Sequence, residues 1–296
     1  MIEIQGLTKR YGSKLAVDRI SFSVGKGEIV GFLGPNGAGK STTMNILTGY
    51  LSATEGRVLI DGHEILEEPT EAKKCIGYLP ELPPLYPDMT VWEYLNFIYE
   101  LKKAKTANKA KHLDTVCGMV KIGHVKDRLI ANLSKGYKQR VGIAQALIGN
   151  PEVLILDEPT VGLDPNQIIE IRSLIKSLSR NHTVILSTHI LSEVQSVCDR
   201  VIIINQGVIV ADDTERNLSE KLSKDKRYTL RVKAPQTDAL TALSRLEKME
   251  SVRPHGQKEQ GDYEFLLQPK IRTSGRMCLN CSGNGIGLCW NLSTTP

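Results

Sequence analysis

This chain of 296 residues has no run of about 18 consecutive apolar residues, the length that a membrane-spanning helix needs. It opens with Met1-Ile2-Glu3-Ile4 and lacks the pattern of a secretory signal peptide. No internal repeat and no heptad pattern is visible. From these absences we expect one large domain, or one large and one small domain, made and kept in the cytoplasm.

A strong charge of one sign is also lacking, because 38 lysine and arginine residues face 33 acidic residues and leave a net charge of +5. The basic residues are interspersed with acidic ones and are not clustered. This pattern does not require nucleic acid as a partner. A mild positive surplus suits contact with an anionic membrane surface.

Cysteine is scarce, with six residues in the chain. We expect the scattered Cys75, Cys117 and Cys198 to be buried thiols. The other three lie near the C-terminal end, and a zinc site there would lack a clear fourth ligand, which disfavours metal binding. These three are Cys278, Cys281 and Cys289.

Acidic residues are absent from the last stretch, residues 271–296, which nevertheless holds half of the cysteines and one of the two tryptophans. The stretch has no clear hydrophobic period. We interpret it as a non-native tail, such as a shift of reading frame near Lys270 would produce. The alternative is a genuine but loosely packed tail that carries cysteines.

The most informative segment that is present reads Gly34-Pro35-Asn36-Gly37-Ala38-Gly39-Lys40-Ser41, which matches the phosphate-binding P-loop. An apolar stretch of strand type, residues 29–33, precedes it, and a helix-compatible stretch follows. Glycines let successive N–H groups point at phosphate oxygens, and a helix N-terminus adds partial positive charge. We expect Lys40 to reach the β- and γ-phosphates and the Ser41 hydroxyl to hold Mg²⁺.

Two further apolar strands end in polar residues. The strand 153–156 runs into Asp157 and Glu158, and the strand 183–186 runs into Ser187-Thr188-His189. A helix over 168–179 between them predicts a βαβ unit with a parallel sheet, so both ends meet at one edge. We expect Asp157 to bind Mg²⁺ through water and Glu158 to act as general base.

Residues from Thr90 to about 149 have helical periodicity, with Thr90 and Glu93 spaced as in a capping box. The basic stretch 102–111 is interpreted as a solvated face. Residues 201–210 predict a hairpin with Gly207 in its turn. A linker helix is expected over 215–225. A small second domain then begins near Arg227, with a strand over 229–233, a helix over 238–249 and a strand over 263–267.

The order of the motifs resembles that of the ATP-binding subunit of an ABC transporter over roughly residues 1–220. Jointly these motifs are far more specific than a lone P-loop. Besides the P-loop they are Leu133-Ser134-x-Gly136 with Gln139-Arg140, Asp157-Glu158-Pro159-Thr160, Gly162-Leu163-Asp164 and His189. The chain resembles the single-domain ATPases of bacterial multidrug and gliding-motility type exporters, including their small C-terminal domain.

The resemblance implies an α/β protein with the P-loop NTPase fold of ABC ATPases. That fold combines a mixed sheet core, an antiparallel β subdomain and a helical subdomain. We place the ATPase domain at residues 1–220, with the helical subdomain at about 88–150. A small C-terminal α+β domain follows at 221–270, and the atypical tail at 271–296.

Roles for single residues also follow from the resemblance. Tyr11 is expected to stack on adenine, and the residues from Gly34 to Thr42 to hold the phosphates of ATP, with Lys40 counted among the catalytic groups. Asp157 is expected to hold the Mg²⁺-bound water, Glu158 to be the catalytic base, and His189 to contact the γ-phosphate.

The remaining expected site residues act across a dimer. The resemblance implies that Ser134 and Gly136 bind the γ-phosphate held by the other subunit, through a hydroxyl, a backbone N–H and a helix N-terminus. Asp164 is expected to contact the partner. We call residues 133–140 the signature segment.

Three positions depart from the family pattern. Glu81 stands where the family usually has glutamine, which keeps a metal contact but adds charge near Mg²⁺. Lys135 and Tyr137 replace a glycine and the glutamine of the usual signature L-S-G-G-Q. Lys135 adds positive charge beside the phosphate.

The resemblance therefore implies an ATPase that binds ATP and Mg²⁺, forms a homodimer, and powers a separate transmembrane permease, in an exporter. It implies a peripheral location on the inner face of the cell membrane and no nucleic-acid partner. One alternative is a soluble ABC ATPase in translation or DNA maintenance, which a single P-loop without heptads disfavours. Another is a binding module with a dead ATPase, which the presence of Lys40, Asp157, Glu158 and His189 disfavours.

Overall fold

The computed structural model describes residues 1–214, 217, 228–244, 249–259, 262–269 and 292–294. The chain divides into two compact units, Met1–Glu215 and Arg216–Pro296. Within the described residues, no helix is both long enough and apolar enough to span a membrane. The predicted linker helix over 215–225 lies almost entirely outside the described residues, and the boundary at residue 220 stays a prediction.

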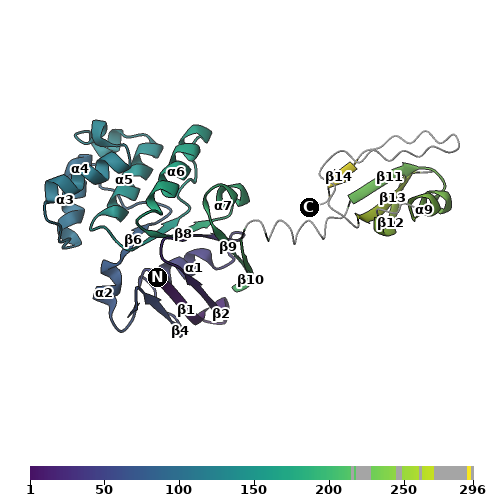
Figure 1. Cartoon of the computed structure of the whole chain (residues 1–296), viewed down its shortest axis with the longest axis horizontal. Coiled ribbons are helices and arrows are strands. Elements are labelled where there is room, and N and C mark those ends of the chain that lie inside the picture. The colour runs from purple at the N-terminus through teal and green to yellow at the C-terminus, as the bar shows by residue number, and fades with distance from the viewer. Residues whose placement is uncertain (215–216, 218–227, 245–248, 260–261, 270–291, 295–296) are drawn as a thin grey trace. The chain divides into compact units, whose positions relative to one another are not determined.

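A six-stranded sheet forms the centre of the larger unit (Figure 1). Its strands are β3 (Ile29–Leu33), β6 (Ile76–Leu79), β7 (Val153–Asp157), β8 (Thr183–Thr188), β9 (Arg200–Asn205) and β10 (Val208–Asp213). They follow the order β10-β9-β3-β8-β7-β6, and only the β9–β10 pair is antiparallel. Leu33 pairs with Thr188 and Asp157 with Ser187. The segments after β3, β7 and β8 therefore leave the sheet at one edge, as the sequence predicted.

An antiparallel sheet of order β2-β1-β4-β5 covers one side of helix α1 (Lys40–Leu47). Its strands are β1 (Ile2–Tyr11), β2 (Lys14–Val24), β4 (Glu55–Ile60) and β5 (His63–Glu64). Met44 and Leu47 of α1 share one buried cluster with Phe32 of the parallel sheet and Ile4 of the antiparallel sheet. Each such buried side chain contributes roughly 2 kcal/mol. The start of α1 is therefore held firmly between the two sheets.

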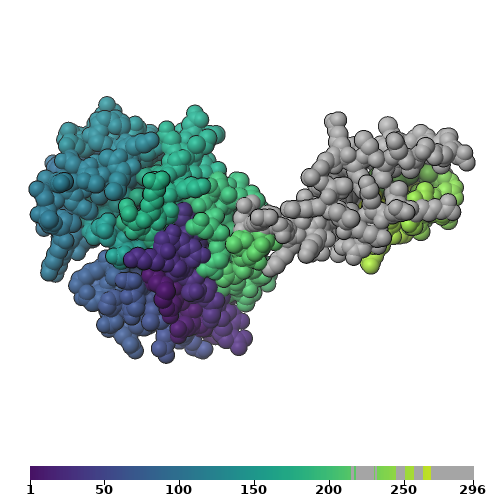
Figure 2. All heavy atoms as spheres, viewed as in Figure 1, coloured from purple at the N-terminus to yellow at the C-terminus, as the bar shows by residue number. Residues whose placement is uncertain are grey.

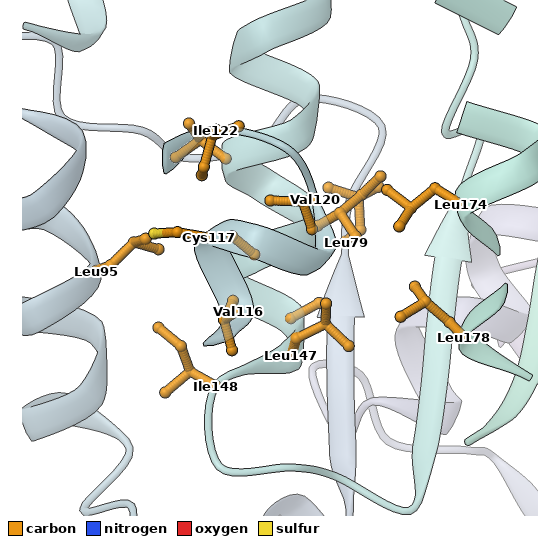
Figure 3. Packing of buried hydrophobic residues seen from close by; sticks show 14 of the residues in the cluster. Leu79, Leu95, Val116, Cys117, Val120, Ile122, Leu147, Ile148, Leu174 and Leu178 are labelled. Atoms are coloured by element: carbon orange, nitrogen blue, oxygen red, sulfur yellow. The ribbon is translucent and has the colours of Figure 1, made fainter. Parts of the chain in front are cut away.

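Helices lie on the other side of the parallel sheet, some packed on the sheet and some on other helices. They are α3 (Val91–Leu101), α4 (Lys109–Met119), α5 (Lys135–Leu147) and α6 (Pro165–Leu178), with short 3-10 helices η1 (Gly123–Val125) and η2 (Ile130–Asn132) between α4 and α5. Figure 3 shows Leu95, Cys117 and Leu147 of these helices converging in one cluster, to which Leu79 of β6 also belongs. Figure 2 shows this helical region, in teal, as a lobe beside the purple and blue segments that hold the antiparallel sheet. Two short helices complete the unit, α2 (Pro69–Lys74) and α7 (Leu191–Val197).

Local sequence signals explain several element ends. The capping box of α3 is confirmed, because the Thr90 hydroxyl accepts from the Glu93 N–H at 3.2 Å while Glu93 accepts from the Thr90 N–H at 2.8 Å. The predicted hairpin is confirmed as β9–β10. Its turn residues Gln206 and Gly207 both have positive φ, 49° and 82°, as a type I′ turn requires.

The prediction of a solvated basic face over 102–111 is wrong at Lys102. The ammonium of Lys102 donates to the carbonyls of Gln145, Ala146 and Ile148 at 3.0, 3.3 and 3.1 Å. It thereby satisfies carbonyls at the C-terminal end of α5 that have no partner within the helix. Burial lowers the pKa of Lys102 to about 8.

The described residues from 228 onward form a four-stranded antiparallel sheet of order β12-β13-β11-β14 and helix α9 (Gln236–Ser244). The strands are β11 (Tyr228–Lys233), β12 (Met249–Glu259), β13 (Asp262–Pro269) and β14 (Leu292–Thr294). Leu230, Phe265 and Leu243 belong to its buried cluster. The predicted helix over 238–249 is wrong at its end, because Met249 pairs with Pro269 and so begins a strand.

Two sequence interpretations concern cysteine and the tail. Cys117 is buried as predicted, whereas Cys75 and Cys198 are only partly buried. The segment 271–296, including its three cysteines, lies outside the described residues except for β14, which pairs with β11. Its interpretation as a non-native tail stays a prediction.

Candidate nucleotide-binding site

The P-loop connects β3 to α1, as the sequence predicted. Gly39 has a φ of 111°, and a Cβ at this position would lie 2.7 Å from the carbonyl oxygen of Ala16. Gly34 is confined as well, because its Cβ would lie 2.3 Å from the carbonyl oxygen of Ile204. Both positions therefore require glycine. The first N–H groups of α1 have no partners within the helix and can bind an anion.

An open pocket of about 680 Å³ lies over this loop. Ten of the predicted site residues line it, and they come from five regions of the sequence. They are Tyr11, Asn36, Gly37, Gly39, Lys40, Ser41, Thr42, Glu81, Glu158 and His189. This volume and this combination of an aromatic ring, backbone amides and charged groups suit a nucleotide.

Gly34, Pro35 and Ala38 do not line the pocket, and their backbone carbonyls accept hydrogen bonds that hold the loop. Lys40 donates to the carbonyls of Gly34 and Pro35 at 2.8 and 3.3 Å, and Ala38 accepts from the Gly207 N–H at 2.9 Å. The Gly207 carbonyl in turn accepts from the Asp18 N–H at 2.8 Å. The hairpin turn therefore connects the P-loop to β2.

Lys40, Glu158 and His189 form a compact charged group in the pocket. The Lys40 ammonium lies 3.8 Å from a carboxylate oxygen of Glu158. The Nδ1 of His189 lies 2.9 and 3.0 Å from the two Glu158 oxygens. Because a carboxylate only accepts hydrogen bonds, Nδ1 carries the proton in this pair. Side chains from three different segments thus meet in the pocket over the P-loop.

Glu158 is held in an uncommon backbone conformation. Its φ is 47°, a left-handed value that costs a residue with a side chain about 1–3 kcal/mol. The Glu158 N–H donates to the Ser187 carbonyl at 3.0 Å, which fixes this conformation. The strained turn directs the carboxylate toward Lys40 and His189, and not into solvent as a simple acidic turn would.

Asp157 lies at the end of β7 and is buried. Burial raises the pKa of Asp157, and the negative charges of Glu158 and Glu81 add to this rise, while Lys40 acts in the opposite direction. One carboxylate oxygen of Asp157 has no hydrogen-bond partner. A buried acceptor without a partner is costly and marks a position where a cation or its water would bind.

The residues fit Mg²⁺ only together with a nucleotide. No group of three or more His, Cys, Asp or Glu side chains is assembled as a metal site among the described residues. Mg²⁺ commonly uses one or two carboxylates plus phosphate oxygens and waters. Asp157 with its unpartnered oxygen, and Ser41 and Glu81 in the pocket lining, supply that smaller set.

The signature segment lies apart from this pocket. Ser134 is the N-cap of α5, and its hydroxyl accepts from the Tyr137 N–H. Gly136 and Asp164 line a second pocket of about 480 Å³, in which no P-loop residue takes part. One chain therefore does not bring Ser134, Gly136 or Asp164 to its own P-loop.

The departures in the signature segment have local partners. The Tyr137 hydroxyl lies 2.9 Å from Nε2 of His124, and their rings pack edge to face. The Lys135 ammonium lies against Gly162, so closely that a Cβ there would overlap it. A side chain of α6, Gln167, lies in the same way against Gly136. These contacts join α5 to the loop and helix that follow β7.

Sequence reasoning missed part of the pocket lining, namely Lys14, Leu15, Ala16, Val161 and Gln206. Closeness in sequence could have found most of them, because the first three follow the turn after Tyr11 and Val161 follows Glu158. Gln206 carried a weaker signal, as part of the predicted hairpin turn.

Comparisons with known proteins agree on one family. The family model described as ABC transporter matches residues 17–161. The Linearmycin resistance ATP-binding protein LnrL of Bacillus subtilis (strain 168) is 36% identical to this chain, over 93% of this chain and 88% of that protein. The Bacitracin transport ATP-binding protein BcrA of Bacillus licheniformis is 40% identical, over 78% and 75%.

A solved structure gives the same result. It is the dimeric structure of a post-hydrolysis state of the ATP-binding cassette MJ0796 bound to ADP and Pi. It is 27% identical to this chain, covers 72% of this chain and 98% of its own, and has a TM-score of 0.65. The α/β fold predicted from the motifs is thereby confirmed.

Proposed function

This chain belongs to the ATP-binding subunits of ABC transporters, which are ATPases, and on that premise we propose that it dimerises around two ATP molecules and drives a separate membrane permease. Each ATP would lie between the P-loop of one copy and the signature segment of the other. Hydrolysis would separate the two copies and pass that movement to the permease.

One observation carries the dimer proposal. Within a single chain, the P-loop lines one pocket while Gly136 and Asp164 line another. Gly136 and the N-cap Ser134 stand at the start of α5, where N–H groups without helical partners can bind phosphate. A second copy would bring these groups to the γ-phosphate. The similar ATP-binding cassette MJ0796 is described as dimeric in a post-hydrolysis state bound to ADP and Pi, which supports a dimer here.

The proposed chemistry is in-line attack of water on the γ-phosphate. Lys40 would bind the β- and γ-phosphates, Glu158 would accept the proton of the attacking water, and His189 would hold the γ-phosphate. Tyr11, 48% exposed at the pocket, would stack on the adenine. Phosphoryl transfer depends mainly on positioning and charge stabilisation, which these fixed groups supply.

Ser41, Asp157 and Glu81 would hold Mg²⁺ together with the phosphates. When bound, the ion would neutralise charge that develops on the phosphate oxygens. The unpartnered oxygen of Asp157 supports this assignment.

An exporter is the transporter class that we propose. One relative is named for linearmycin resistance and another for bacitracin transport, and both are named ATP-binding proteins. The protein would then lie on the inner face of the cell membrane, with its helical region and Glu81 facing the permease.

The first experiment tests the dimer. The full chain with Glu158→Gln is mixed with ATP and Mg²⁺, and its molar mass is measured by light scattering after size exclusion. We expect a dimer, because the variant binds ATP without hydrolysing it. Adding Ser134→Asp should abolish the dimer, since aspartate still caps α5 but repels the γ-phosphate of the partner. Adding Asn108→Asp, the matched change at the N-cap of α4, should leave the dimer intact.

A monomer in the Glu158→Gln sample at saturating ATP would contradict the proposal, and so would a dimer that survives Ser134→Asp. The second experiment tests the permease. The tagged protein is purified from native membranes in mild detergent, and its partners are identified by mass spectrometry. A multi-spanning protein in stoichiometric amount supports the transporter assignment, whereas ribosomal or other soluble partners alone would favour a soluble ABC ATPase.

A further inference from the structure

Glu193 on α7 is a buried carboxylate to which no sequence motif had drawn attention. Its exposed fraction is 2%. One carboxylate oxygen accepts a hydrogen bond from the Thr160 hydroxyl, and the other accepts from the Thr188 hydroxyl at 2.6 Å. The guanidinium of Arg172 on α6 lies 3.7 Å from it. A buried carboxylate is tolerated only when it is paired in this way, so its partners define its position.

The two threonines belong to the two catalytic segments. Thr160 lies two residues after Glu158, and Thr188 directly precedes His189. Both threonine side chains are buried. Glu193 therefore joins, through one rigid carboxylate, the loop after β7 to the end of β8.

The bond to Thr188 also fixes the chain beyond His189. Because the Thr188 hydroxyl donates to Glu193, its oxygen is free to accept, and it accepts from the Ile190 N–H at 3.1 Å. The backbone is thus held on both sides of His189. On the other loop, the strained turn at Glu158 is held by its N–H bond to Ser187.

We infer that Glu193 is a positioning residue for ATP hydrolysis, which sets the separation of the two loops at which Glu158 and His189 meet. This inference rests on the proposed role of Glu158 as the base. Arg172 adds an ion pair at the same carboxylate oxygen that accepts from Thr160. Loss of the hydrogen bonds from Thr160 and Thr188 to Glu193 would leave both catalytic side chains present but misplaced with respect to the γ-phosphate.

The first test measures steady-state ATP hydrolysis by the full chain with Glu193→Gln. An amide keeps the size of the side chain but cannot accept at both ends. We expect kcat to fall by about 10- to 100-fold, the loss that a displacement of about 1 Å can cause. The KM for ATP should stay within about twofold, because the P-loop is untouched.

Glu28→Gln is the matched control. Glu28 is also an ion-paired glutamate, half-buried where Glu193 is buried, and it bonds to Arg200 at the opposite edge of the same sheet. Its variant should lower stability without lowering kcat. If Glu193 only stabilised the fold, both variants would have the wild-type kcat when the rate is calculated per folded, ATP-binding molecule.

A second measurement does not depend on activity. Hydrogen–deuterium exchange should be faster at the Glu158 and Ile190 amides of Glu193→Gln, because their hydrogen bonds to Ser187 and Thr188 depend on the position of Glu193. Exchange at the same two amides should be unchanged in Glu28→Gln. Wild-type kcat and wild-type exchange in Glu193→Gln would overturn the inference.

The failure of this inference can be told from the failure of the proposed function. Glu158→Gln is assayed in parallel. If Glu158→Gln keeps full turnover, Glu158 is not the base and the proposed function fails. If Glu158→Gln is inactive while Glu193→Gln is fully active, only the role of Glu193 is refuted. The double variant should lose no more than Glu158→Gln alone, because Glu193 acts through Glu158.

Discussion

The two edges of the parallel sheet treat their charged groups in opposite ways. At the amino-terminal edge, Arg200 donates to Glu28 at 2.7 Å and to Asp212 at 2.6 Å, and Glu28 also accepts from the Gly25 N–H at 2.7 Å. At the carboxyl edge, Asp157 keeps an oxygen without a partner and Glu158 sits in a strained turn.

The difference separates stability from function. The amino-terminal edge satisfies its charges within the chain, so changes there should cost folding free energy. The carboxyl edge keeps groups that are strained, crowded or without partners, and under the proposed function they would be compensated by contacts with bound ATP. Substitutions at the two edges should therefore move different observables.

The largest effect should come from Glu158→Gln at the carboxyl edge. Removal of a general base typically costs about 10²- to 10⁴-fold in rate. We expect kcat to fall by that factor while the free energy of unfolding does not decrease, because the change also removes charge beside the buried Asp157. ATPase assays and urea denaturation measure the two quantities. A clear loss of stability with little loss of kcat would break the comparison.

Arg200→Met at the amino-terminal edge should do the reverse. It leaves Glu28 and Asp212 without their partner, and breaking such a partly buried pair costs about 3 kcal/mol. Urea denaturation should report this loss, while kcat per folded molecule stays at the wild-type value. A kcat that falls with stability would show that the two edges are coupled.

Lys102 lies at neither edge, and we expect it to make the free energy of unfolding depend on pH. Its pKa is about 8 in the folded protein, below the usual value for lysine, so between pH 8 and about pH 10 the unfolded chain binds a proton that the folded chain has lost. Stability from this group therefore rises with pH. Relative to Lys102→Met, the wild type should gain about 2 kcal/mol over this range, measured by urea denaturation. A difference that stays constant with pH would contradict the burial of this ammonium.

The smallest effect is expected for Asn108→Ala. The Asn108 side chain accepts from the Lys111 N–H at 2.9 Å at the exposed start of α4. Loss of an N-cap costs about 1 kcal/mol. Thermal denaturation should show this loss with unchanged kcat, and a larger loss would indicate that the cap supports more than α4.

The sequence predicted the features that depend on local backbone conformation and on the order of the strands. The P-loop needs glycine at Gly34 and Gly39 because a side chain there would overlap a backbone carbonyl. Strands 153–156 and 183–186 had to end at one edge because they are parallel strands of one βαβ unit. Consequently the sequence alone predicted that Lys40, Glu158 and His189 lie close together. The capping box at Thr90 was equally local.

The sequence could not predict bonds between distant positions. Lys102 donates to carbonyls more than 40 residues away, and nothing in its basic neighbourhood distinguishes it from solvated lysines. Glu193 looks like an ordinary helix residue until α7 packs and brings it to Thr160 and Thr188. Such groups acquire their roles only through tertiary packing.

The hairpin turn at Gln206 and Gly207 has a consequence for protein engineering. Tips of surface hairpins are common sites for inserted tags or domains. Here the Gly207 N–H and carbonyl are both used, by Ala38 in the P-loop and by Asp18 in β2. An insertion at this tip would disturb the hydrogen bond that holds the phosphate loop. A reporter domain placed there should therefore lower the affinity for nucleotide.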